Sequence, residues 1–196
     1  FANLATQILS SSIFNRRNAI KANGPQEYPS KWQKAERKFV LATKSIENNN
    51  IQRAEKLNID ASQEFNAIEL LSIKDLILAN ARIQINLAKD KKAERYAPIT
   101  LNQAYGFLNS ADRELTTDRY NIEIANLLVE KSIERSSHAI FLSILIQSLQ
   151  DKLLTTEELI IEWETNLAKI ANSADIYPLV TNCLLYTSPS PRDHQP

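Results

Sequence analysis

Apolar residues recur at every third or fourth position along most of this chain. One such series runs through Trp32, Ala35, Phe39, Ala42 and Ile46. Spacings of three and four residues place these side chains on one face of an α-helix, as in the a and d positions of a coiled coil. The series therefore predicts an amphipathic helix that begins near Ser30 and ends at the polar residues 48–50.

The same period predicts five further helices. They cover residues 2–23, 51–89, 100–117, 122–154 and 155–171. Three of the predicted helix starts also fit the capping box. In that motif a Ser or Thr and a Glu or Gln three residues later exchange hydrogen bonds with each other's backbone N–H groups. The three pairs are Ser30 with Gln33, Thr100 with Gln103, and Thr155 with Glu158.

Two segments of the chain share one pattern. A shift of 69 positions places residues 29–46 on residues 98–115, with a proline at the start of each. After the following turn, a shift of 71 positions places residues 51–61 on residues 122–132. Large apolar residues alternate with alanine in both segments, which favours close helix packing. We interpret the match as an internal repeat of two helical hairpins; the alternative is that unrelated amphipathic helices share a heptad period.

The predicted fold is all-α, with two long antiparallel helical hairpins, flanking helices and a disordered C-terminal tail. Only two glycines occur in the chain, which leaves few tight turns and disfavours β-sandwich and Rossmann folds. The expected segments are an N-terminal helix over residues 1–24, hairpins over 26–93 and 94–154, a C-terminal helix with the native end over 155–182, and a non-native tail over 183–196.

The expected tail differs in composition from the rest of the chain. Residues 183–193 match the translation of a common transposon-end sequencing adapter, and three of the seven prolines follow residue 188. The alternative is a natural linker rich in Ser and Pro. Cys183 and His194 are therefore set aside as functional candidates. Because the chain begins at Phe1 and contains no methionine, it is expected to be a metagenomic fragment of a longer protein.

Charge and hydropathy argue against two kinds of partner. Lys plus Arg and Asp plus Glu number 23 each, so the net charge is zero and no overall field attracts nucleic acid. The longest apolar run, residues 139–146, is far shorter than the ~20 residues of a membrane-spanning helix. We expect neither nucleic-acid binding nor a membrane-spanning segment.

The candidate chemical groups do not assemble into a site. His138 has no second His or Cys at metal-ligand spacing, so it is interpreted as a packing or surface residue. Four carboxylates are interpreted as the solvated face of the last helix: Glu157, Glu158, Glu162 and Glu164. No phosphate-binding loop, nucleophile elbow or zinc-protease motif occurs. We therefore expect no catalytic, cofactor-binding or metal-binding residues, no cofactor, and no enzyme activity.

The remaining basic and aromatic residues have structural interpretations. A first basic cluster is too small to indicate nucleic-acid binding: Arg16, Arg17 and Lys21. A second lies where the dipole at the C-terminus of the long helix favours cations: Lys89, Lys91 and Lys92. The two tryptophans, Trp32 and Trp163, lie on apolar helix faces and are expected in the core.

Three short stretches carry a family resemblance. They are residues 94–104, which include Tyr96-Ala97-Pro98, the turn Asp118-Arg119-Tyr120-Asn121, and Ser137-His138-Ala139. Together they resemble the helical region of bacterial envelope lipoproteins that often precedes an OmpA-like peptidoglycan-binding domain. The resemblance covers residues 94–142 well and 26–172 loosely. Ile122 and Ser137 depart from the Thr and Arg that are common in that family.

The resemblance implies a function that composition and periodicity do not. It implies a non-catalytic helical spacer and interaction region on the periplasmic side of the bacterial outer membrane. Peptidoglycan would be bound through a C-terminal domain outside this sequence, and envelope proteins would be further partners. No binding residue is transferred, because the lipid-anchoring cysteine and the peptidoglycan-binding domain are absent from residues 1–196. The alternative is a soluble helical-repeat adaptor that binds another protein.

Overall fold

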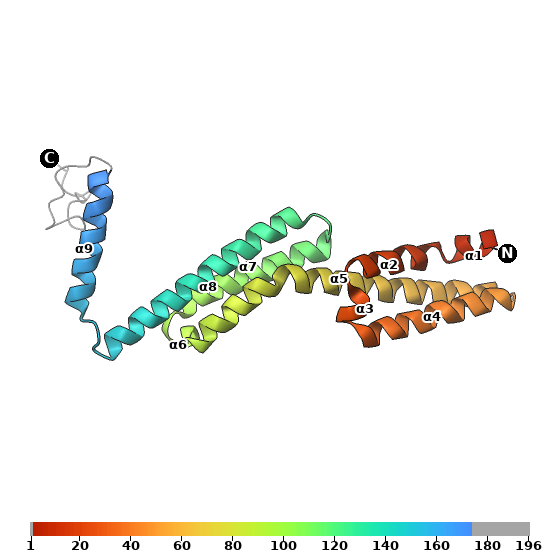
Figure 1. Cartoon of the computed structure of the whole chain (residues 1–196), viewed down its shortest axis with the longest axis horizontal. Coiled ribbons are helices and arrows are strands. Elements are labelled where there is room, and N and C mark those ends of the chain that lie inside the picture. The colour runs from red at the N-terminus through yellow and green to blue at the C-terminus, as the bar shows by residue number, and fades with distance from the viewer. Residues whose placement is uncertain (1, 174–196) are drawn as a thin grey trace, which may run out of the picture. The chain divides into compact units, whose positions relative to one another are not determined.

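The computed structural model of the chain describes residues 2–173, and every regular element in that range is an α-helix (Figure 1). The all-α prediction is confirmed. The expected disordered and non-native tail lies outside the described residues. The chain divides into two compact units, residues 1–143 and 144–196, which are described separately.

Nine helices are described in residues 2–173. They are α1 (Ala2–Ile8), α2 (Ser10–Lys21), α3 (Gly24–Glu27), α4 (Pro29–Glu47), α5 (Ile51–Asp90), α6 (Ala93–Tyr96), α7 (Pro98–Thr117), α8 (Ile122–Gln150) and α9 (Thr156–Ser173). Helix α8 begins in the first unit, and its residues after Ser143 belong to the second.

The first half of α5 packs with α2 and α4, and we call these helices the first bundle (Figure 1). Its centre is the fully buried ring of Phe65. The rings of Trp32 and Phe39 on α4 lie 5.0 and 6.4 Å from it, centroid to centroid. Small buried residues such as Ala19 and Ala35 bring the helix backbones together around these rings.

The second half of α5 packs with α7 and with residues 122–143 of α8, and we call these helices the second bundle (Figure 1). Leu78, Leu101 and Leu115 are buried in it among many alanines. The Ser132 hydroxyl on α8 donates to the carbonyl oxygen of Ala104 on α7 at 2.9 Å, which requires close approach of the two helices. The predicted apolar series on α4 and on α7 are therefore each packed against a neighbouring long helix.

The turns that lead into α4 and α7 have the same backbone geometry. Asn23 and Lys92, 69 positions apart, both adopt the left-handed conformation, with φ of 65° and 62°. Each is followed by a single helical turn, α3 or α6, and then by a proline that opens the next helix. The two turns thus agree in structure at positions that the sequence shift aligns.

Two of the three predicted capping boxes are wrong. Helices α4 and α7 begin at Pro29 and Pro98, one and two residues before the expected caps, and no side chain caps either helix. Proline presets the helical φ and lacks the N–H that a cap would satisfy, so it starts the helix without one. The third box is confirmed: Glu158 N–H donates to Thr155 Oγ1 at 3.2 Å, and Thr155 N–H donates to Glu158 Oε2 at 2.8 Å.

The ends of other helices also differ from expectation. The predicted helix over residues 2–23 breaks at Leu9, where Asn58 of α5 accepts a hydrogen bond from the Ser12 N–H at 3.3 Å and caps the new start. Helix α8 ends at Gln150 instead of residue 154. Trp163 was expected in the core, but it is 66% exposed on α9. Amphipathic spacing identifies a helix face, whereas burial depends on what covers that face.

Two turns dock on the middle of α5. From the α7–α8 turn, Arg119 and Tyr120 bind the buried Glu69 carboxylate at 3.2 and 2.7 Å, and Arg119 also donates to the Asn66 carbonyl oxygen at 2.9 Å. The hydrogen bond to Glu69, together with burial, raises the pKa of Tyr120. The Asn18 amide of α2 reaches the same Tyr120 hydroxyl at 3.3 Å. This cluster, which we call the Glu69 junction, joins the two bundles.

The second docking point comes from the turn before α4. The Tyr28 hydroxyl donates to Asp75, which also accepts from Arg82 at 2.6 Å. The hydrogen bond to the carboxylate, burial and the nearby negative charge raise the pKa of Tyr28 to about 12. The hydrogen bonds from Tyr28 and Arg82 hold the pKa of Asp75 below its usual value despite partial burial. The middle of α5 is therefore held by one tyrosine–carboxylate pair from each side.

Candidate functional site

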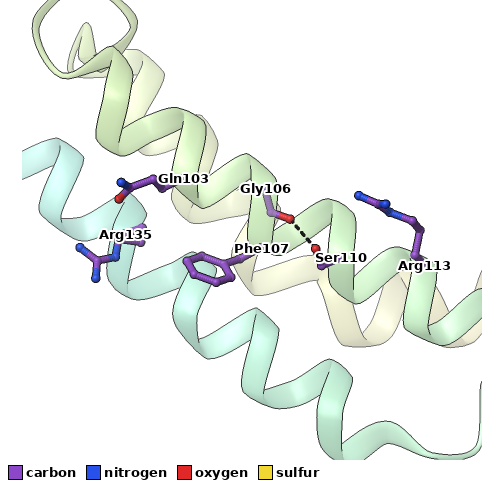
Figure 2. Close-up of a pocket in the computed structure, with 6 residues that line it drawn as sticks. All are labelled: Gln103, Gly106, Phe107, Ser110, Arg113 and Arg135. Carbon is purple, nitrogen blue, oxygen red and sulfur yellow. Dashed lines mark hydrogen bonds between the residues drawn. The ribbon is translucent and has the colours of Figure 1, made fainter.

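A groove of about 600 Å³ lies across α7 and α8 in the second bundle (Figure 2). Its volume is within the range of small-ligand and peptide side-chain pockets. Six residues line it: Gln103, Gly106, Phe107, Ser110, Arg113 and Arg135. All but Arg135 lie on α7, at spacings of three and four that bring them to one face of that helix.

The apolar floor of the groove is Phe107, which extends from α7 toward α8 (Figure 2). The side chain is only half-buried, so part of the ring remains available for contact. Gly106 beside it is exposed, and a Cβ at that position would meet nothing within 4 Å. The missing side chain therefore widens the groove. The Ser110 hydroxyl donates to the Gly106 carbonyl oxygen at 2.9 Å and lines the wall.

Three cations surround this floor. Arg135 lies at the end of the groove near Gln103, and Arg113 lies at the other end (Figure 2). The Lys131 ammonium is 5.9 Å from the centroid of the Phe107 ring, within the range of a cation–π contact. No carboxylate is among the six lining residues. Within the described part of the chain, Arg135 forms no ion pair.

The corresponding face of the first bundle is bridged by ion pairs. Glu64 on α5 accepts from Lys38 and Lys34 of α4 at 2.8 and 3.1 Å, and Lys38 lies 3.6 Å from Asp60. Burial disfavours the ionised form of Glu64, but the two lysines outweigh it and hold its pKa below the usual value. The hydrogen bond to Glu64 raises the pKa of Lys38. Ion pairs to Glu64 Oε1 thus bridge α4 and α5 on this face, while Glu64 Oε2 is buried without a hydrogen-bond partner.

The two faces occupy positions that the sequence shifts align. On the shorter helix of each pair, Lys34 and Lys38 align with Gln103 and Phe107. On the longer helix, the same alignment pairs acids with bases: Asp60 with Lys131, and Glu64 with Arg135. The second bundle therefore lacks the two acids and the two lysines that form the ion pairs of the first bundle. In their place it has two cations, Lys131 and Arg135, and the aromatic ring of Phe107. At positions that the sequence shifts align, the first bundle thus has ion pairs between its helices, and the second bundle has a groove lined by arginines.

The residues singled out in the sequence lie elsewhere. His138 is exposed on α8, with its ring 6.5 Å from that of Phe141. The four glutamates of α9 are all exposed, and the hydrogen bonds from Thr155 lower the pKa of Glu158. In residues 2–173, no three His, Cys, Asp or Glu side chains are grouped so that they could hold a metal ion. None of the described helices combines the length and apolar character needed to cross a bilayer.

One basic residue of the first cluster has a clear structural role. Arg16 binds Glu36 at 2.5 Å, and its guanidinium lies 5.5 Å from the ring centroid of Trp32 and 5.9 Å from that of Phe39. It covers the aromatic core of the first bundle. Trp32 packs against that core as expected.

Sequence reasoning missed the groove, although a signal was present. When the two hairpins are aligned, Glu64 corresponds to Arg135 and Lys38 corresponds to Phe107. These differences in charge and polarity lie at the groove. The aligned apolar positions define the repeat, whereas the site lies at aligned polar positions where the residues differ. A scan against known protein-family models finds no match for this chain, and searches of curated proteins and of solved structures also give none.

Proposed function

We propose that this chain is a non-catalytic helical spacer and interaction region of a cell-envelope lipoprotein. In this function, α5 holds the two bundles at a set separation and the second bundle offers a surface to other proteins. A helix of 40 residues extends about 60 Å at 1.5 Å per residue, so it can carry one bundle on each half.

The observation that supports the spacer most strongly is the Glu69 junction. Glu69 is 3% exposed, and its carboxylate is held by Arg119 and Tyr120 from the α7–α8 turn of the second bundle. Asn18 of the first bundle contacts the same Tyr120 hydroxyl. Bending α5 at its middle would separate these groups and leave a buried carboxylate without its cation, which is costly. The junction therefore opposes flexing between the bundles.

The family resemblance supports the envelope location. The turn Asp118-Arg119-Tyr120-Asn121 is part of that resemblance, and two of its residues form the junction. In this proposal the chain lies on the periplasmic side of the outer membrane, and a further domain binds peptidoglycan. Extending the coding sequence in both directions tests this location. A lipid-anchoring cysteine upstream and an OmpA-like domain downstream support it, and the absence of both rejects it.

Distance measurements between spin labels test the spacer. With Cys183→Ser removing the only cysteine, labels at Lys44→Cys and Asn102→Cys report on the two bundles. We expect one narrow distance distribution, which broadens when Glu69→Ala is added. A second label pair within the first bundle, Lys44→Cys with Lys56→Cys, should remain narrow in both backgrounds. A broad distribution between the bundles before any change at Glu69 contradicts the spacer.

A second candidate function is a helical-repeat adaptor that binds a protein partner outside the cell envelope. The open groove on α7 and α8 favours it, because the equivalent face of the first bundle is internally paired. Further hairpins of the same length in the extended coding sequence would support the adaptor over the envelope spacer.

A further inference from the structure

We propose that the groove between α7 and α8 binds an extended acidic segment of a partner protein, in which one apolar side chain between two carboxylates packs on Phe107. This inference rests on the interaction part of the proposed function. It identifies the surface that is used and the chemistry of the segment that is bound.

The charge of the groove selects a carboxylate ligand. Arg113 and Arg135 stand at its two ends, and Lys131 lies against the Phe107 ring between them. Because the chain is neutral as a whole, this local excess of positive charge is not a consequence of overall composition. Arginine guanidinium groups bind carboxylates through paired N–H donors, which adds orientation to the attraction.

The dimensions of the groove set the spacing of the ligand. Gln103, which lies beside Arg135, and Arg113 are ten residues apart on α7, or about 15 Å along the helix axis. An extended peptide rises about 3.3 Å per residue, so side chains four positions apart on one face span about 13 Å. Two acidic residues at positions i and i+4 can then reach the two ends. The residue at i+2 faces the same side and meets Phe107.

The surroundings of the groove favour a short peptide over a long polyanion. Glu114, Glu130 and Glu134 are exposed and adjoin Arg113, Lys131 and Arg135 in the sequence. Proteins that bind DNA strongly make roughly six to ten phosphate contacts, whereas this site offers three cations. A short segment with two carboxylates needs no more cations than these three.

The first bundle supplies the design of a matched variant. Phe107→Lys together with Arg135→Glu recreates the Lys38–Glu64 pair at the aligned positions of the second bundle. Phe107→Lys adds one positive charge and Arg135→Glu replaces a positive charge with a negative one, so the double variant lowers the net charge by one. A triple variant that also carries Glu130→Gln restores the net charge. The same pair is accommodated in the first bundle, so the variant is expected to fold.

Fluorescence anisotropy of a labelled peptide on the full chain tests the proposal. The probe carries Glu-Ser-Leu-Ser-Glu, and two control peptides carry Gln-Ser-Leu-Ser-Gln and Glu-Ser-Ser-Ser-Glu. We expect the probe to bind at least about tenfold more tightly than either control. We also expect Phe107→Lys/Arg135→Glu to lower its affinity by about tenfold or more. Lys44→Glu, at the aligned position of Arg113 on the first bundle, should leave the affinity unchanged.

Four results overturn the proposal. The first two are that the probe does not bind, or that it binds no more tightly than the control peptides. The third is that the double variant binds the probe with full affinity, and the fourth is that the chain binds a single-stranded oligonucleotide or anionic lipid vesicles more tightly than the probe. Circular dichroism of each variant verifies the helical fold. If the peptide does not bind specifically but the distance distribution between the bundles is narrow, only the proposed peptide-binding groove is rejected. If the peptide binds specifically but that distribution is broad, only the proposed spacer function is rejected.

Discussion

The two bundles present different surfaces at positions that the sequence shifts align. In the first, Lys34 and Lys38 of α4 bind Glu64 of α5, and the face between the helices is bridged. In the second, the aligned positions hold Gln103 and Phe107 opposite Arg135, and the face opens into a groove. The difference lies in side chains that point away from the core.

The comparison shows which residues carry the frame and which carry the surface. Buried alanines occur at aligned positions in both short helices, at Ala35 and Ala104 and again at Ala42 and Ala111. These residues set how closely the backbones approach, so they cannot change freely. The outer positions are free of that constraint. A few substitutions there can convert an internally paired face into one that binds a partner.

The bundles also differ in how their cores are filled. Phe65 is fully buried between Trp32 and Phe39, whereas the aligned Ser136 is buried with its hydroxyl bonded to the Ser132 carbonyl oxygen at 2.8 Å. One core is filled by rings and the other by close backbone contact. Substitutions at the two positions should therefore have very different consequences.

The largest effect is expected for Phe65→Ala. Removing this ring should lower the free energy of unfolding by about 3–5 kcal/mol, because it leaves a cavity between α4 and α5. Ser136→Ala is the matched control and should change it by less than about 1 kcal/mol, since only a hydrogen bond within α8 is lost. Urea unfolding of the full chain, followed by circular dichroism, measures both. If the two substitutions lowered the free energy of unfolding by similar amounts, the proposed difference between the two cores would be refuted.

Glu69→Ala should have the next largest effect and should act on both bundles. It leaves the Arg119 guanidinium, whose side chain is 16% exposed, without its carboxylate, at a cost of about 3 kcal/mol. Glu94→Ala is the control, because Glu94 is exposed and lies 3.7 Å from Lys89 in a surface pair. Hydrogen exchange should show loss of protection in α2 and in the α7–α8 turn together. A loss confined to one bundle would argue against the junction as a link.

A smaller effect is expected for Tyr28→Phe, with a distinctive pH dependence. The change removes a hydrogen bond to a carboxylate and should cost about 1.5 kcal/mol at neutral pH. The pKa of Tyr28 is raised in the folded chain to about 12, so its contribution is complete below its usual value of 10.0 and is lost as the pH rises from there to about 12. Part of the alkaline loss of stability should therefore be absent in the variant. Tyrosinate absorbance identifies the titrating group, and an identical alkaline profile would count against this pair.

The smallest effect is expected for Glu64→Gln, which breaks the ion pairs of the first bundle. Lys38 and Glu64 are partly exposed, so the cost should be below about 1 kcal/mol and should shrink further in high salt. Because the pKa of Glu64 is lowered, its contribution is present at neutral pH and is lost as the pH falls below the usual value of 4.5. Arg135→Gln at the aligned position should show no such acid dependence. A matching acid-dependent loss in both variants would contradict the contrast between the faces.

The sequence by itself determined the helical content and the apolar faces of the first unit. Alternating large residues and alanine from Trp32 to Ile46 specify an amphipathic helix, because periodicity is a local property that the backbone geometry converts directly into one face. The polar turn at residues 48–50 and the turn at 118–121 were also evident. The starts of two helices were predicted less accurately, because α4 and α7 begin at Pro29 and Pro98 and not at the expected side-chain caps.

Only the tertiary structure decided which polar residues meet. Glu69 reads as one charged residue in a long helix, and its burial follows from the docking of a turn 50 residues later in the chain. Phe107 and Arg135 likewise line one groove because α7 and α8 pack side by side at a distance that Ala104 and Ser132 set. Local spacing determines the face on which a side chain lies. The partner of that face depends on contacts between segments far apart in the sequence, which no local pattern encodes.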